Sequence, residues 1–450
     1  MGQYMAPKTL EKLPELSPSE FEATLNKATE LHEAGKLIEA HHFYKELLQQ
    51  QPKHARLLFL KAVVLYQMDR VDEALPFIQR AVALDGLNPD ILNAYGLIRR
   101  NMRDFEGALK LFQEVVKIRP NFYEALNNIG LVYGDMGERE KAIPYFKKAL
   151  EQAPAASDEI MLNLAHCLRD NNQIEEALEY YSKLAETHPE SVRHVFNLAI
   201  ILHSLGRFDE TIAHLERVLT LQPNNIDAQH LLRAVRGDAD ANQVPDSYIA
   251  DLFDNYAKDF DMHLAALQYQ VPKMLAARIP YVVAPKTKPG QWQMLDLGCG
   301  TGACGLYFNT HCSRMVGVDL SAKMIAKART HNVYDDLHVQ GIDDYYAQTD
   351  EQFDVIFATD VLVYIGALEN FMTESAKHLK AGGLLAVSTE LCTPDEGDYI
   401  LRTSGRFAQS DPYMLKLANA NGLKKMINAD ITVRMGQHEP IPGKLYIFKK

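Results

Sequence analysis

The sequence of 450 residues predicts two architectures in one chain, an α solenoid of helical repeats followed by an α/β domain with a mostly parallel sheet. Three observations predict this division. Small residues recur every 34 or 35 positions through the first half, strands alternate with helices from about residue 290, and residues 294–302 run from an apolar strand into a glycine turn. Such a period is typical of stacked helix pairs, and such alternation is typical of a parallel sheet covered by helices.

The composition excludes several classes of function. The net charge of −12 disfavours broad electrostatic binding of nucleic acid, although 47% hydrophobic and 24% charged residues are ordinary for a globular protein. The five cysteines form no CxxC pair, so we expect reduced thiols and no metal site. No signal-type segment and no apolar run near the roughly 20 residues of a membrane helix are visible, so we expect a cytoplasmic protein without a membrane partner.

The repeat is clearest in residues 123–156. Gly130 and Ala142 are expected where two antiparallel helices cross, because only small side chains fit there, and Phe146 is expected to fill the seam to the next helix. Most copies have a proline twelve residues after the small residue, where it ends the second helix. One pair cannot bury its apolar face alone, so we expect six pairs to stack, with residues 226–236 as a capping helix. The recurring small residues are Ala40, Ala74, Ala108, Ala142, Ala177 and Thr211.

Position by position, residues 21–225 resemble the tetratricopeptide repeat. Four copies carry asparagine at the sixth position, which faces the concave groove in that family, and this is similar to the asparagine ladder of O-linked N-acetylglucosamine transferases. The resemblance implies a protein or peptide partner in the groove; the alternative is that these asparagines are solvated surface residues. Leu60 and Ala94 interrupt the series. The asparagines are Asn26, Asn128, Asn163 and Asn197.

Small and polar residues without a period predict a linker over residues 237–247. Helical periodicity over 248–279, broken at Pro272, predicts two helices before the sheet. The expected division is an N-terminal segment at 1–20, a solenoid with its cap at 21–236, the linker, and an α/β domain at 248–450.

Five strands are predicted in the α/β domain, followed by a closing hairpin whose last strand is antiparallel. A turn at residues 380–383, with two glycines, precedes the fifth strand. The strands are predicted at 292–297, 315–319, 337–341, 353–359 and 384–389, and the hairpin at 430–435 and 444–448.

The glycine turn predicts a nucleotide-type site. Gly298 and Gly300 leave bare main chain at the end of a buried strand, so a ligand can lie against it. Asp319 ends the next strand, where a carboxylate can bind two ribose hydroxyls. Residues 300–305 also satisfy GxGxxG, so a nicotinamide cofactor is the competing interpretation of this weak motif.

Asp296 completes the pattern D-x-G-x-G-x-G. With the lysine-glycine-glycine turn and the closing hairpin, residues 248–450 resemble class I S-adenosylmethionine-dependent methyltransferases, and nearly the whole chain resembles predicted bacterial-type methyltransferases that carry tetratricopeptide repeats. The resemblance implies a seven-stranded Rossmann-like sheet with an antiparallel last strand, S-adenosyl-L-methionine as cofactor, and no metal. Many relatives have an acid at the position of Gly341, so Ile342 and Asp343 are expected to meet the adenine instead. The cofactor-binding residues implied are Asp296, Gly298, Cys299, Gly300, Gly302, Asp319, Leu320, Ile342, Asp343 and Asp360.

The methyl acceptor is not named by any motif, and the catalytic residues stay open. Packing of helices over the sheet is an equal interpretation for Tyr256 and His263. The expected function is a methyltransferase whose solenoid recruits a protein substrate or partner. The alternatives are a small-molecule methyltransferase whose repeats serve oligomerisation, and a cofactor-binding scaffold without turnover. The candidates near the methyl exit are Tyr256, His263, Asp360 and Tyr364, with Glu390 and Arg406 beside them.

Overall fold

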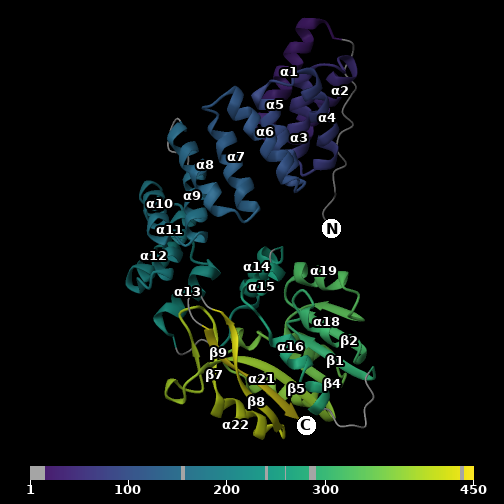
Figure 1. Cartoon of the computed structure of the whole chain (residues 1–450), viewed down its shortest axis with the longest axis vertical. Helices are drawn as coiled ribbons and strands as arrows, with labels where there is room; N and C mark the ends of the chain where they lie inside the picture. Colours follow the sequence, from purple (N-terminus) through teal and green to yellow (C-terminus); the bar gives the residue numbers. More distant parts are fainter. Residues whose placement is uncertain (1–15, 154–157, 239–241, 259, 283–289, 436–439) are drawn as a thin grey trace. The chain divides into compact units, whose positions relative to one another are not determined.

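The computed structural model describes residues 16–153, 158–238, 242–258, 260–282, 290–435 and 440–450 (Figure 1). The chain forms two compact units, Met1–Gly206 and Arg207–Lys450. The first unit holds helices α1 to α11, and the second holds α12 and everything after it. The domain boundaries expected from sequence stay predictions.

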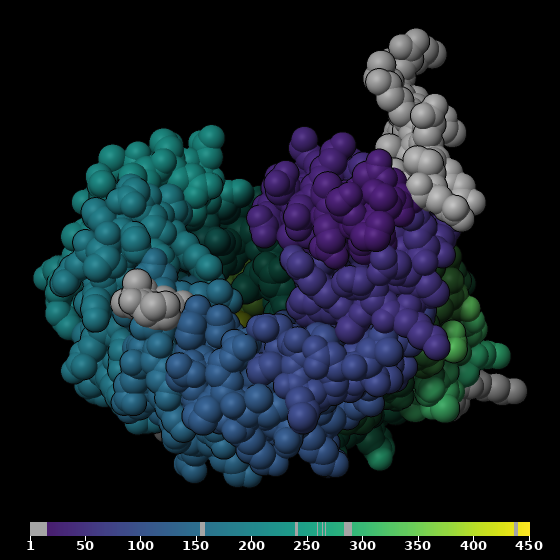
Figure 2. All heavy atoms as spheres, turned by 90° about the horizontal axis from the view of Figure 1, so that it is seen from above, coloured from purple at the N-terminus to yellow at the C-terminus, as the bar shows by residue number. Residues whose placement is uncertain are grey.

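The first unit is a series of antiparallel helix pairs that follow one another along a curved path (Figure 2). Small residues at the helix crossings were predicted for steric reasons, and the packing confirms this, because a Cβ atom on Gly130 would lie 2.7 Å from the ring of Phe146. Prolines were predicted to end the second helices, and α2 and α6 end two residues before Pro52 and Pro120. The helices are α1 (Pro18–Glu33), α2 (Leu37–Gln50), α3 (Ala55–Gln67), α4 (Val71–Leu84), α5 (Pro89–Asn101), α6 (Phe105–Ile118), α7 (Tyr123–Asp135), α8 (Arg139–Gln152), α9 (Asp158–Asp170), α10 (Ile174–Thr187) and α11 (Val192–Ser204).

The second unit begins with α12 (Phe208–Leu221) and α13 (Ile226–Arg236), the helix predicted at 226–236. The prediction of two helices before the sheet is wrong, because the described residues between 246 and 282 form four short helices. Pro272 lies in the first turn of α16, where its missing N–H breaks no helical bond, so it begins a helix and does not interrupt one. The four are α14 (Asp246–Tyr256), α15 (Phe260–Ala266), α16 (Val271–Ala276) and α17 (Ile279–Val282).

Seven strands form the predicted sheet in the order β3-β2-β1-β4-β5-β9-β8. The first five are parallel, β9 is antiparallel to β5, and β8 and β9 form the predicted closing hairpin. The strands are β1 (Trp292–Leu297), β2 (Cys312–Asp319), β3 (Asp336–Val339), β4 (Phe353–Ala358), β5 (Leu379–Cys392), β8 (Lys424–Met435) and β9 (Pro440–Lys449). The helices that follow β1 and cover the sheet are α18 (Ala303–Phe308), α19 (Ala322–Thr330), α20 (Ile342–Gln348), α21 (Glu369–Lys377) and α22 (Asp411–Ala420).

Two features of the sheet were not predicted. Short strands β6 (Tyr399–Leu401) and β7 (Phe407–Ser410) form a hairpin that extends the carboxyl end of β5. The turn predicted before the fifth strand is a bulge inside it, because Phe353 already pairs with Leu379. The hairpin lies beside the carboxyl end of β5, whereas the bulge lies beside the first residues of β4.

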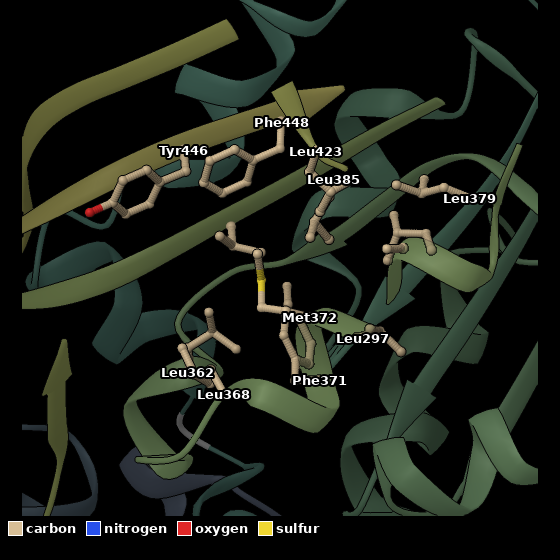
Figure 3. Packing of buried hydrophobic residues seen from close by; sticks show 14 of the residues in the cluster. Leu297, Leu362, Leu368, Phe371, Met372, Leu379, Leu385, Leu423, Tyr446 and Phe448 are labelled. Atoms are coloured by element: carbon tan, nitrogen blue, oxygen red, sulfur yellow. The ribbon is translucent and has the colours of Figure 1, made fainter. Parts of the chain in front are cut away.

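An apolar core fills one side of the sheet (Figure 3). Tyr446 and Phe448 from β9 and Leu385 from β5 meet Phe371 and Met372 of α21, all buried. Burial of large aliphatic and aromatic side chains contributes roughly 1.5–3 kcal/mol each, so this layer fixes the strands whose carboxyl ends carry the polar residues described next.

Candidate active site

A cavity of about 830 Å³ opens at the carboxyl ends of β1, β2 and β4. Ligands of open α/β sheets bind at this end of the strands. Gly302 and Glu390 do not line the cavity, and the side chain of His263 lies outside the described residues. The predicted residues that line it are Tyr256, Asp296, Gly298, Cys299, Gly300, Asp319, Leu320, Ile342, Asp343, Asp360, Tyr364 and Arg406.

The glycine turn after β1 requires glycine for two reasons. Gly298 has a φ of +66°, a conformation that side chains disfavour. A Cβ atom there would also lie 2.3 Å from Cγ2 of Val361, the residue that follows Asp360. At Gly300 a Cβ atom would be 3.6 Å from the nearest atom, so bare backbone faces the cavity.

Asp319 holds this turn and still faces the cavity. One carboxylate oxygen accepts from the backbone N–H of Gly300 at 2.8 Å, and the other accepts from the N–H of Ser321 at 2.8 Å. Burial raises the pKa of this carboxyl, although the two backbone hydrogen bonds oppose the shift. Because each oxygen can accept more than one hydrogen bond, the group keeps acceptor capacity for a ligand.

Asp296 is almost fully buried, and its partner was missed by sequence reasoning. The hydroxyl of Tyr334 donates to Asp296 at 2.7 Å and accepts from the backbone N–H of Gly305 at 3.2 Å. Burial raises the pKa of Asp296 to about 8, while the Tyr334 hydrogen bond lowers it. Tyr334 lies 38 residues from Asp296 with no motif around it, so only the fold joins the two.

Two acids, Asp246 and Asp343, line the part of the cavity around Gly341. Asp343, expected to meet adenine, accepts from the side-chain amide of Asn370 at 2.9 Å. Asp246 of α14 reaches into the space that a side chain on residue 341 would occupy, since a Cβ atom on Gly341 would lie 2.9 Å from its Oδ2. Burial raises the pKa of Asp246, and Asp343 adds to this shift. Sequence reasoning did not single out Asp246.

Helices α14 and α15 are tied to the strand ends by two acids. Asp254 accepts from the Ser321 hydroxyl at 2.5 Å, and Ser321 is the N-cap of α19. Asp261 accepts from the hydroxyl of Thr301 in the glycine turn at 2.6 Å. These bonds hold an apolar wall, which includes Phe253, across the cavity.

Charged residues gather where β4 ends. Asp360 has a φ of +57°, uncommon for a residue other than glycine. Arg434 of β8 donates to Asp360 at 3.0 Å and to Glu390, which is buried behind it. Arg406 lies 3.6 Å from Asp360 and over the ring of Tyr364. Burial raises the pKa of Tyr364 to about 12, so its phenol is protonated at neutral pH.

The turn that carries Arg406 is held from outside the sheet. His230 of α13 donates through Nε2 to the carbonyl oxygen of Gly405 at 2.9 Å, and its ring packs 4.9 Å from that of Tyr248. Residues 242–244 of the predicted linker are also held, because Val244 donates its N–H to the carbonyl of Tyr364 at 2.9 Å. Helix α13 and these residues therefore brace the β4 end of the cavity.

The cavity thiols are unsuited to nucleophilic chemistry, since burial raises the pKa values of Cys299 and Cys304 well above their usual range. Within the described ranges, no group of three or more histidines, cysteines or acids could hold a metal ion. Among the helices that the structure describes, none combines the length and apolar character required to span a bilayer.

Family models match both halves of the chain. Residues 295–387 match a model described as a methyltransferase domain. Models described as the tetratricopeptide repeat match residues 31–98, 94–157, 135–199 and 195–225. The chain therefore carries tetratricopeptide repeats and a methyltransferase domain.

Curated relatives match only part of the second half. The ubiquinone biosynthesis O-methyltransferase of Bradyrhizobium sp. (strain ORS 278) is 35% identical over 103 residues, 22% of this chain and 39% of that protein. The malonyl-[acyl-carrier protein] O-methyltransferase of Enterobacter lignolyticus (strain SCF1) is 28% identical over 141 residues, 31% of this chain and 53% of that protein. The chain thus spans about two fifths to one half of the length of these relatives.

Among solved structures, one titled as a functional characterization of Pseudomonas aeruginosa pilF is 21% identical and covers 47% of this chain and 96% of its own, with a TM-score of 0.41. YrrB, titled a TPR protein with an unusual peptide-binding site, is 18% identical and covers 42% and 96%, with a TM-score of 0.35.

Proposed function

Because the chain carries a methyltransferase domain and tetratricopeptide repeats, we propose that it is an S-adenosylmethionine-dependent methyltransferase whose solenoid binds a protein partner. The observation that carries the proposal is the cavity at the glycine turn, where bare backbone at Gly300 lies beside the carboxylate of Asp319. When bound, the cofactor supplies a methyl group on positively charged sulfur.

The residues present fit an adenosyl ligand. Asp319 has acceptor capacity for two ribose hydroxyls, and the glycine turn leaves room for close approach along the main chain. Leu320 and Ile342 supply apolar contact for a purine ring. We assign the adenine amino group to Asp246 in place of Asp343, because Asp246 reaches into the space left by Gly341. Each carboxylate also accepts one side-chain hydrogen bond, Asp246 from Gln243 at 3.2 Å and Asp343 from Asn370 at 2.9 Å, and keeps a second oxygen.

Buried Asp296 is assigned to the turn and not to direct contact. Its carboxyl is held by Tyr334, whose hydroxyl also accepts from the first turn of α18, so the pair fixes the backbone that the ligand would touch. Positioning the acceptor in line with the methyl group supplies most of the rate of such a transfer, so rigid strand ends favour it.

Oxygen is the proposed acceptor atom, because both kinds of relative reported above carry O-methyltransferase in their names. The repeats support a protein partner, since stacked helix pairs form extended binding surfaces. Two of the ladder asparagines are engaged internally: Asn128 donates to Asn93 at 3.0 Å and Asn163 donates to Asn127 at 3.1 Å. We therefore propose that other groove residues contact the partner.

Calorimetry on the full chain tests the cofactor. We expect S-adenosylmethionine and S-adenosylhomocysteine to bind with micromolar dissociation constants and NAD not to bind. Absence of S-adenosylmethionine binding at millimolar concentration would refute the proposal, and binding of NAD alone would favour the dinucleotide interpretation.

A second experiment tests the partner. Methyl-labelled cofactor and the full chain are added to a lysate of a strain that lacks the gene. Label in protein supports a recruited substrate. Label only in small molecules contradicts recruitment of a protein substrate and favours the small-molecule alternative.

A further inference from the structure

Arg406, at the β4 end of the cavity, has one guanidinium nitrogen without a hydrogen-bond partner among the described residues. Nη1 of Arg406 is buried and has no hydrogen-bond partner among the described residues. Its nearest acid, Asp360, is 3.6 Å away, too far for a hydrogen bond. A buried donor without a partner costs about 1–3 kcal/mol, so such a group in a native fold calls for an explanation.

The neighbouring charges do not supply that partner. Asp360 accepts from Arg434, and Glu390 is also held by Arg434. Arg406 is instead held by its position over the ring of Tyr364, 5.5 Å from the centroid, with about a quarter of its side chain exposed where it lines the cavity. The guanidinium therefore lines the cavity as a cation, and one of its nitrogens has no hydrogen-bond partner among the described residues.

The chemistry of the walls limits what that occupant can be. Most of the wall from α14 and α15 is apolar or aromatic, with Leu252, Phe253 and Phe260 lining the cavity, and Asp246 and Asn255 are its polar members. Among the described side chains that line the cavity there is neither histidine nor lysine. Tyr364 and the cavity thiols hold their protons at neutral pH, and Asp360 is in ion pairs. At the β4 end of the cavity, an acceptor that must first lose a proton therefore finds no free base. The remaining carboxylates of the lining lie at the glycine turn and around Gly341.

We infer that the methyl acceptor is a carboxylate at the end of an apolar or aromatic body, bound through Arg406. This inference rests on the proposed function and names its substrate class. A carboxylic acid with a pKa of about 4 is ionised at neutral pH and needs no base. One carboxylate oxygen accepts from Arg406, and the other is the nucleophile.

The step balances without a proton transfer. An electron pair of the carboxylate oxygen forms the new oxygen–carbon bond, and the carbon–sulfur bond breaks with its electron pair passing to sulfur. One negative and one positive charge are lost together, so the products are a neutral methyl ester and a neutral thioether. Loss of charge during the reaction is favoured by walls of low polarity.

The binding test uses the full chain loaded with S-adenosylhomocysteine. Calorimetry compares octanoate and cinnamate with octanamide and cinnamamide, which keep the body and lack the charge. We expect each acid to bind at least tenfold more tightly than its amide, and Arg406→Gln to abolish this preference while S-adenosylhomocysteine affinity changes less than twofold. Equal binding of acid and amide, no binding of either acid at 10 mM, or an unchanged preference in Arg406→Gln would overturn the inference.

Controls separate folding and cofactor effects from the acceptor effect. Arg402 lies in the same turn, pairs with Glu396 and does not line the cavity. The Arg402→Gln variant should therefore still bind each acid more tightly than its amide. Arg406→Lys keeps the charge and should retain part of the preference if Arg406→Gln unfolds. If S-adenosylhomocysteine does not bind, the proposed function fails. Calorimetric titration of octanoate and cinnamate into the protein without S-adenosylhomocysteine then still measures whether Arg406 binds a carboxylate.

The product gives an independent readout. Label transferred in the lysate experiment should be released as methanol at alkaline pH, as methyl esters are, whether the acid is free or carried on a protein. The small-molecule and protein fractions distinguish these two sources. Label that survives alkali, as methyl ethers and methylamines do, would overturn the inference.

Discussion

The two units treat polar side chains at their predicted binding surfaces in opposite ways. In the solenoid, Asn128 is buried and bonded to Asn93, and Asn163 is bonded to Asn127, so these amides stabilise the stack. In the cavity, Asp319 keeps spare acceptor capacity and Arg406 keeps an unused donor. The contrast teaches that polar groups satisfied within the fold serve stability, whereas groups left open at a cavity serve a ligand. Substitutions can break or sharpen this distinction.

The largest expected effect concerns Asp296, a satisfied and buried carboxyl whose pKa is raised to about 8. Between about pH 4 and pH 8 the native protein holds a proton that the unfolded chain has released, so the free energy of unfolding falls as pH rises. The loss is on the order of 5 kcal/mol at pH 8. Asp296→Asn cannot ionise, so its unfolding free energy, measured in urea at pH 5 and pH 8, should fall by much less. Equal losses in both proteins would contradict burial as the cause.

The next largest effect is expected for Asp319, whose carboxylate keeps acceptor capacity for a ligand. Asp319→Ala should weaken S-adenosylmethionine binding by at least tenfold, about 1.5–3 kcal/mol, because hydrogen bonds to a charged acceptor are lost. Asp354→Ala is the matched control, since Asp354 also accepts from a backbone N–H, that of Gln293, but lies at the amino end of β4. Calorimetry that finds similar affinities in both variants would remove the ribose role from Asp319.

Single substitutions of the neighbouring carboxylates Asp246 and Asp343 test which of them binds the adenine amino group. Asp246→Ala should weaken cofactor binding about fivefold, about 1 kcal/mol for one hydrogen bond, whereas Asp343→Ala should change it less than twofold. Competition with an inosine form of S-adenosylhomocysteine, which lacks the amino group, should show no penalty in Asp246→Ala. The reverse ranking of the two variants would restore the assignment made from sequence.

The smallest effect is expected in the solenoid. Asn128→Ala and Asn163→Ala should each lower the free energy of unfolding by about 1 kcal/mol without changing cofactor affinity. Asn26→Ala is the control, because Asn26 occupies the same repeat position and is exposed, so its effect should stay within about 0.5 kcal/mol. If thermal unfolding is unchanged in Asn128→Ala but partner binding is lost, the ladder binds a ligand and the contrast fails.

Local signals made much of the fold predictable. Strand β1 has its predicted bounds because an apolar run ends sharply at a glycine turn, and the solenoid follows from a strict period. Strands β6 and β7 were missed because runs of three and four residues carry too little pattern. The four short helices before the sheet were taken for two, since periodicity does not reveal where each helix ends.

The candidate site was predictable only where one segment carries the whole motif. Asp319 and the glycine turn lie within 21 residues, but Tyr334 meets Asp296 and Asp246 meets Gly341 only through folding. The unused donor of Arg406 could not be foreseen either, because it depends on which residues claim Asp360 and Glu390. Residue types point to a chemistry, while their availability depends on tertiary partners.

The hydrogen bond from His230 to Gly405 has a consequence for how such a gene can be rearranged. Through this bond, α13 holds the loop that carries Arg406. A recombination breakpoint just after residue 236 would replace all the preceding helices, including α13. The loop that carries Arg406 would then lose its hydrogen bond from His230. Recombination preserves this hydrogen bond when the breakpoint falls before α13, so α13 is inherited together with the sheet.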